Sequence, residues 1–167
     1  MRRVVVSVLT VFAVWQARAA DSWFTVEKDA GDGISAATQN QTGQLLGQYC
    51  DYAESACYWN LLLDTPCDKG VTVPSLISEG ANSAAITAHC QGRVPGSSPA
   101  TYRYLLSDFD TVDKVVRGGG IVGIAFALDS GRFQVVRFSS VGAAAQLDSM
   151  RTKANSKAQA TTGSSKL

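Results

Sequence analysis

The sequence has few of the residues and spacings that mark metal sites and membrane anchors. Its 167 residues include a single histidine, His89. No two of its four cysteines stand two to four residues apart, as the paired ligands of structural zinc sites do. After the N-terminal segment, no apolar run approaches the roughly 20 residues that span a bilayer. The sequence therefore argues against a metal site and against a transmembrane segment in the mature chain.

The body of the chain also lacks clustered positive charge. Between Ala20 and Met150 there are 8 basic and 14 acidic side chains, whereas Arg151–Leu167 has 4 basic residues and no acid. Nucleic acids are bound largely through Lys and Arg side chains that neutralise phosphates. This charge distribution argues against a nucleic-acid partner.

The N-terminal residues have the three parts of a secretory signal peptide. Arg2 and Arg3 form a basic start, Val4–Val14 is mostly apolar, and Ala17 and Ala19 supply small residues near a cleavage point. We expect residues 1–19 to be removed, which leaves 12 basic and 14 acidic side chains and a net charge of −2. The predicted location is therefore the periplasm or the cell exterior.

The cysteine content is that of a disulfide-stapled exported protein. Cys50, Cys57, Cys67 and Cys90 make an even set, which in an oxidising compartment indicates disulfide bonds. Three pairings are possible. Residues 51–56 look like a hairpin loop between two apolar segments, so Cys50–Cys57 is favoured, which leaves Cys67–Cys90.

Short runs of β-forming residues are separated by turn signals about every ten residues, which is typical of an antiparallel β-sandwich or barrel. The expected strands are Trp23–Glu27, Ile34–Thr38, Leu45–Cys50, Cys57–Leu63, Val71–Pro74, Ser83–Cys90, Tyr102–Leu106, Ile121–Leu128 and Phe133–Phe138. The fold class predicted from this pattern is a mainly β domain with a short helix and a C-terminal helix.

Two helices complete the expected domain. Asp110 is placed as the N-cap of a short helix that ends near Gly118. Ser139 and Ser140 precede a second helix, whose apolar residues Ala143, Leu147, Met150 and Ala154 recur on one face. One domain is predicted over residues 20–154, followed by a disordered polar and basic tail at 155–167.

Catalytic residues are hard to identify. His89 adjoins Cys90, but neighbours on a strand point to opposite faces, which is a poor geometry for a nucleophile and its base. Asp108, Asp110 and Asp113 form the densest carboxylate group. Capping and first-turn charge on a helix explain two of them without any catalytic role. A small hydrolase using Asp108 or His89 remains an alternative.

Aromatic side chains offer the better candidates for binding. Tyr58 and Trp59 must point to opposite faces of their strand, so one of them is expected at the surface. Tyr52 stands on the loop between two cysteines, where burial is difficult. Tyr52 and Trp59 are therefore the predicted contact residues, since Tyr and Trp dominate binding energy at interfaces.

The chain resembles the invasion-associated locus B family of exported bacterial proteins. The likeness lies in Trp23 near the mature start, the Cys50/Cys57 pair before an apolar strand, Asp68–Val71, and Phe138–Ala143 before the last helix. The family pattern has a second cysteine pair late in the chain, where this sequence has only Cys90. The resemblance implies a small periplasmic or surface-associated β-sandwich with no established catalytic residues.

These observations favour a non-enzymatic exported module that binds a protein or a cell-envelope component. No cofactor is expected. An inhibitor or immunity protein directed against a secreted hydrolase is the alternative in the same compartment, and a stable complex with one specific enzyme would identify it. The small hydrolase is the alternative from a different class, and loss of activity on changing Asp108 or His89 would support it.

Overall fold

The computed structural model describes residues 22–27, 31–127 and 131–163. The predicted signal peptide therefore lies outside the described residues. The strands are β1 (Phe24–Glu27), β2 (Gly33–Gln39), β3 (Leu45–Asp51), β4 (Ala56–Leu63), β5 (Thr72–Glu79), β6 (Asn82–Arg93), β7 (Tyr102–Leu106), β8 (Ile121–Ala127) and β9 (Phe133–Ser139). The helices are α1 (Phe109–Val116) and α2 (Ala143–Gly163).

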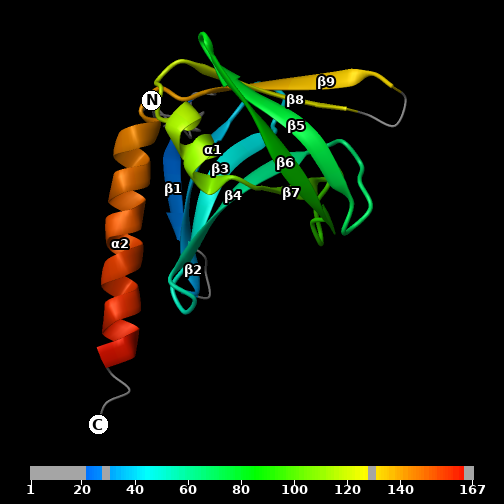
Figure 1. Ribbon diagram of the computed structural model, residues 1–167. Helices are drawn as coiled ribbons and strands as arrows, with labels where there is room; N and C mark the ends of the chain where they lie inside the picture. Colours follow the sequence, from blue (N-terminus) through cyan, green and yellow to red (C-terminus); the bar gives the residue numbers. More distant parts are fainter. Residues whose placement is uncertain (1–21, 28–30, 128–130, 164–167) are drawn as a thin grey trace, which may run out of the picture.

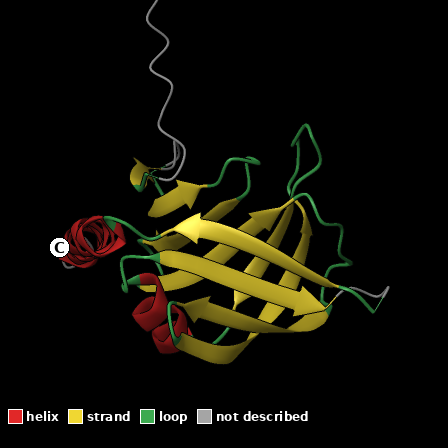
Figure 2. Ribbon diagram, turned by 90° about the horizontal axis from the view of Figure 1, so that it is seen from above, coloured by secondary structure: helices red, strands yellow, loops and turns green. Residues whose placement is uncertain are grey.

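All nine strands belong to one antiparallel sheet in the order β1-β2-β3-β4-β7-β6-β5-β8-β9. The sheet curves strongly, as the views in Figures 1 and 2 show. The two ends of the sheet, β1 and β9, lie close together. Next to β1, the indole Nε1 of Trp23 donates a hydrogen bond to the Ser139 carbonyl at the end of β9, 2.9 Å away. The predicted mainly β fold with one short and one C-terminal helix is confirmed.

The core lies between the inner face of this sheet and the two helices. The alternation of β-strand side chains places Leu61 and Leu63 inward, together with Trp59. Helix α1 buries Val112 and Val116 against strands β4, β5 and β6. Helix α2 runs alongside β1 in Figure 1 and packs on β1, β2 and β3.

The apolar face predicted for the second helix is the face that packs. Ala143, Leu147, Met150 and Ala154 are all buried. The helix does not stop there, however, and the prediction of a disordered tail from residue 155 is wrong as far as Gly163. No helix in the described part of the chain is long and apolar enough to cross a membrane.

The N-cap of α1 differs from the prediction. It is Asp108, with a left-handed backbone (φ 58°) and no capping hydrogen bond from its side chain, whereas Asp110 lies in the first helical turn. At α2, the Ser140 hydroxyl donates to the Gly120 carbonyl, 3.0 Å away, so it ties the helix to the loop before β8. The serine and aspartate residues therefore located both helices, whereas the N-cap predicted for α1 is wrong by two residues.

Both disulfides predicted from the cysteine spacing are present. Cys50–Cys57 links residues directly opposite each other on β3 and β4. Cys67–Cys90 ties the connection between β4 and β5 to strand β6. There is no free cysteine. Two disulfides are compatible with an exported protein.

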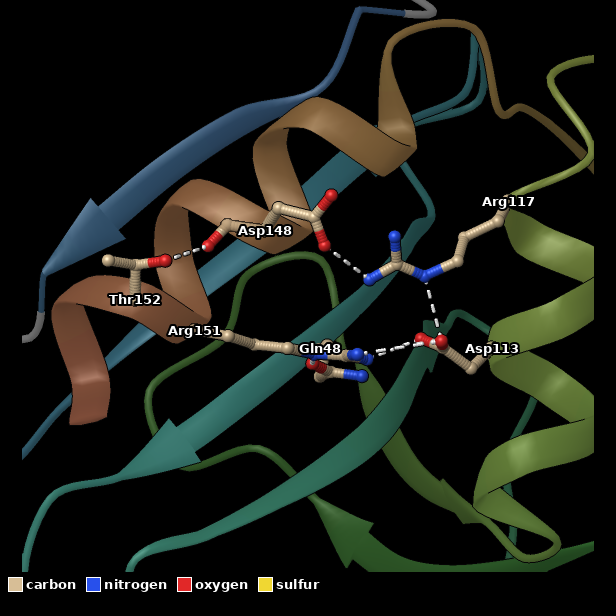
Figure 3. A network of polar contacts seen from close by, with 6 residues as sticks. All are labelled: Gln48, Asp113, Arg117, Asp148, Arg151 and Thr152. Atoms are coloured by element: carbon tan, nitrogen blue, oxygen red, sulfur yellow. Dashed lines mark hydrogen bonds and ion pairs between the residues drawn. The ribbon is translucent and has the colours of Figure 1, made fainter.

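A network of charged side chains joins the two helices to the sheet (Figure 3). Asp113 on α1 accepts from Arg117 at 2.8 Å and also pairs with Arg151 of α2. Arg117 donates to Asp148 of α2 at 2.8 Å, and Arg151 donates to the Gln48 side chain on β3 at 2.7 Å. Asp113 therefore lies between Arg117 and Arg151, and the ion pairs of these three residues and Asp148 attach α2 to α1.

We expect Asp113→Asn to lower the free energy of unfolding by about 2 kcal/mol, because hydrogen bonds to charged groups contribute about 1.5–3 kcal/mol. The substitution also leaves Arg117 and Arg151 facing each other without the shared carboxylate. Urea denaturation would measure the loss. Asp110→Asn is the matched control, since that exposed side chain has no part in the network, and equal losses in both variants would contradict this account.

Candidate binding groove

The outer face of the sheet, opposite the helices, carries an open groove of about 540 Å³. We call it the outer groove. It is lined by Val26, Ser35, Ala37, Leu45, Gly47, Tyr49, Asp51, Glu54, Tyr58, Asn60, Leu62, Gln91, Arg103 and Leu105. These residues come from β1, β2, β3, β4, β7 and β6 and from the β3–β4 loop, so the site lies across the strands.

Strand register explains why a groove forms. The residues directly opposite one another make three rows across the sheet. One outer row is Val26, Ser35, Tyr49 and Tyr58; the middle row is Ala37, Gly47, Asn60 and Leu105; the other outer row is Leu45, Leu62 and Arg103. The middle row has only small side chains on β2 and β3, so the outer rows form walls roughly 13 Å apart.

Gly47 fixes the depth of the middle row. A Cβ at this position would lie 2.6 Å from the Ala37 Cβ and 2.7 Å from the Ala36 carbonyl oxygen. No real side chain tolerates such contacts, so the local packing of β2 against β3 requires glycine here. On β2 and β3 the floor of the groove is therefore backbone and methyl groups.

The aromatic wall is fixed by hydrogen bonds to acidic residues of the β3–β4 loop. Tyr58 donates to the Glu54 carboxylate at 2.7 Å, and Tyr49 donates to Asp51 at 3.3 Å. Asp51 in turn accepts from the backbone of Ala53 and Glu54, at 2.8 and 3.0 Å. The hydrogen bond to Glu54 raises the pKa of Tyr58, and desolvation raises the pKa of Tyr49. Both phenols therefore stay neutral and oriented at ordinary pH.

Tyr49 also lies against the backbone of β2. A Cβ on Gly33 would lie 2.5 Å from its ring carbon Cε2 and its hydroxyl oxygen. The absence of a side chain at Gly33 thus lets the phenol ring lie over the strand. Beside it, on β4, Tyr58 is 38% exposed. Together the two rings make an aromatic surface along one side of the groove.

The opposite wall, the middle row and strand β6 supply polar groups with remaining hydrogen-bonding capacity. Arg103 is exposed, and the structure gives its guanidinium no ion-pair partner in the part of the chain that it describes. Asn60 donates through Nδ2 to the Tyr58 carbonyl at 3.3 Å, and Gln91 donates through Nε2 to the His89 carbonyl at 3.5 Å. Both amide groups keep an oxygen that can accept from a ligand.

The two contact residues predicted from the sequence are not at the surface. Trp59 points inward, is 1% exposed and packs edge-on against Trp23 at 6.4 Å between ring centroids. Tyr52 is 8% exposed, because it follows the outward-facing Asp51 and its backbone N–H bonds to the Asp32 carbonyl. The expectation that Tyr52 and Trp59 present a contact surface is wrong, and the exposed aromatic residue of β4 is Tyr58.

The residues considered for hydrolysis have separate partners. His89 is exposed and lies opposite Leu105, and its Nδ1 is 3.1 Å from the Thr72 hydroxyl. Asp108 accepts from the Ser107 hydroxyl at 3.1 Å. Within the described ranges, no group of three or more His, Cys, Asp or Glu residues is arranged to hold a metal ion.

The sequence does not show that the groove residues share one site, for a definite reason. Tyr49, Asn60 and Arg103 stand on three strands, and nothing in the local pattern shows that β4 pairs with β7. The usable signal was the period-two alternation of β4, which requires Tyr58 and Asn60 to share a face opposite Trp59. That alternation identifies the face but gives no partner strands.

Comparison of the chain with known protein families, with curated proteins and with solved structures finds no match.

Proposed function

We propose that this protein is a non-enzymatic exported module that binds a protein or cell-envelope component in the outer groove. The observation that carries the proposal is the groove itself, in which an aromatic wall and polar groups with remaining hydrogen-bonding capacity converge over a small-residue floor. Binding sites are typically concave, mostly apolar and furnished with a few placed polar groups. The groove has each of these properties.

Preorganisation also supports a binding role. The tyrosine wall is held by Asp51 and Glu54, and the loop that carries these acids is stapled at its base by Cys50–Cys57. Groups already fixed in their bound positions lose little entropy when a ligand arrives. The two disulfides further support a location in the periplasm or outside the cell.

The proposal predicts that ligand probes perturb the groove and no other part of the sheet. ¹⁵N-labelled oxidised protein is titrated with linear tetrasaccharides, with a pool of twelve-residue peptides and with phosphatidylglycerol vesicles. At least one class is expected to shift the amide signals of Gly47, Asn60 and Leu105 saturably. The absence of saturable shifts with all three classes, or shifts confined to β8 and β9, would contradict the proposal.

A matched pair of variants sharpens this test. Ala37→Leu places a branched side chain over the small-residue floor and is expected to weaken binding at least tenfold. Ala85→Leu makes the same change on β6, at an exposed position opposite Leu76 and outside the groove. Equal affinity in the two variants would place the binding site elsewhere.

A further inference from the structure

We propose that the occupant of the outer groove is an uncharged oligosaccharide chain. This inference rests on the proposed binding function and adds the chemical class of the ligand. It draws on four features of the groove: the aromatic wall, the charges on the two walls, the position of the groove within the sheet, and its length.

The aromatic wall suits the apolar face of a sugar ring. Tyr49 lies over Gly33, and Tyr58 stands beside it on the next strand with its ring partly exposed. The Tyr58 hydroxyl is already bonded to Glu54, so the exposed part of the Tyr58 ring is the surface offered to a ligand. A phenol ring offers a flat apolar surface at a low entropy cost, against which the C–H groups of a sugar pack.

The charges on the two walls favour a neutral ligand with many hydroxyls. Asp51 and Glu54 lie at the tyrosine wall, whereas Arg103 lies on the opposite wall. A strongly anionic chain would be repelled on one side and a cationic chain on the other. Hydroxyl groups donate to carboxylates and amide oxygens and accept from guanidinium, so a neutral saccharide can satisfy both walls.

The place of the groove within the sheet argues against a peptide strand. Most of the groove crosses β2, β3, β4, β7 and β6, each of which is paired with a strand on both sides, and only Val26 comes from the edge strand β1. Peptides that bind sheets usually add a strand at an open edge through main-chain hydrogen bonds. Here the backbone groups are already used by the ladder, so recognition depends on side chains, as it does for a saccharide.

The length of the site agrees with a chain of sugars. The middle row runs from Ala37 on β2 to Leu105 on β7, across three strand spacings of about 4.8 Å each, or roughly 14 Å. Beyond Leu105 the same row continues to His89 on β6. Several linked sugar rings can therefore lie along the row between the two walls.

The experiment is an array of linear tetrasaccharides that includes neutral, N-acetylated and uronic-acid chains, followed by calorimetric titration of the oxidised protein with each chain that binds. Neutral or N-acetylated chains are expected to bind saturably, and uronic-acid chains are expected not to. Affinity is expected to change less than about twofold between 50 and 500 mM salt, because an uncharged ligand has no charge for salt to screen.

Variants of the aromatic wall separate ring stacking from other effects. Tyr58→Ala is expected to weaken saccharide binding at least tenfold, whereas Tyr58→Phe, which keeps the ring, stays within about threefold. Phe133→Ala is the control, because that residue is 73% exposed on β9, outside the groove. Saccharide binding that is insensitive to Tyr58→Ala would overturn the inference.

The remaining outcomes distinguish this inference from the proposed function. If the peptide pool or the vesicles shift the groove amides and no saccharide does, the groove is a binding site and the saccharide assignment is wrong. Binding of uronic-acid chains alone would overturn the argument from charge. If no probe of any class shifts those amides, both the inference and the proposed function fail.

Discussion

Replacing Trp59 by alanine is expected to lower the free energy of unfolding by about 3–5 kcal/mol, the usual cost of truncating a buried tryptophan. The side chain is 1% exposed and packs against Trp23, whose indole closes the sheet by bonding to Ser139. Loss of the ring therefore leaves a cavity at the point where the two ends of the sheet meet. Urea denaturation of the oxidised protein measures the change.

Tyr58→Ala is the natural control, since the two residues are neighbours on β4 and face opposite sides of the sheet. Removing this exposed ring loses the cross-strand pairing with Tyr49 and a solvent-exposed hydrogen bond to Glu54, so the expected cost is about 1 kcal/mol. The two variants should differ in opposite ways: Trp59→Ala lowers the free energy of unfolding, and Tyr58→Ala weakens ligand binding. Equal stability losses in both variants would contradict the assignment of the two faces.

Local sequence patterns were sufficient to find most of the strands. Alternation and turn residues located β4 and β7 almost to the residue, because their signals are local: apolar periodicity within the segment and breakers at its ends. Helix α2 was found the same way, from Ala143, Leu147 and Met150 on one face. The prediction of its end failed because residues 155–163 carry no breaking residue before Gly163, only polar composition.

Strand β5 shows why local sequence patterns do not predict the full extent of every strand. The expected strand ended at Pro74, and proline has no N–H to donate to the ladder. The strand in fact continues to Glu79. Pairing between β5 and β8 begins only at Ser75, so Pro74 lies outside the β5–β8 ladder. Whether a proline is tolerated depends on which neighbouring residues it faces, and those are distant in sequence.

The binding groove depends on the same kind of long-range information. The strand order places β7 beside β4 and β5 beside β8, and two strands lie between the partners in sequence in each case. Arg103 reaches the wall of the groove only because it pairs with Leu62 of β4. Tyr52 was placed wrongly for a related reason: a loop between two cysteines suggested exposure, but the inward phase of β3 continues through it.

Removing the Cys67–Cys90 disulfide by double alanine substitution is expected to lower the free energy of unfolding by about 3.5 kcal/mol, and removing Cys50–Cys57 by about 2.5 kcal/mol. The difference follows from loop length, because the sequence separations are 23 and 7 residues. Cys50 and Cys57 are also ladder partners in a tight hairpin. The backbone bonds of β3 and β4 therefore keep these residues close when the disulfide is absent.

The Cys67–Cys90 disulfide constrains the longer segment of chain. The connection from β4 to β5 is tied to β6 by backbone bonds at Cys90, which accepts from Gly70 at 2.9 Å and donates to Val71 at 2.8 Å. Without the disulfide, these two bonds remain the ties between Cys90 and a long connection. Urea denaturation of both double variants, with thiol counts confirming the remaining bridge, measures the order. A larger loss from removing Cys50–Cys57 would show that hairpin geometry, not loop closure, sets the contribution of these bridges to stability.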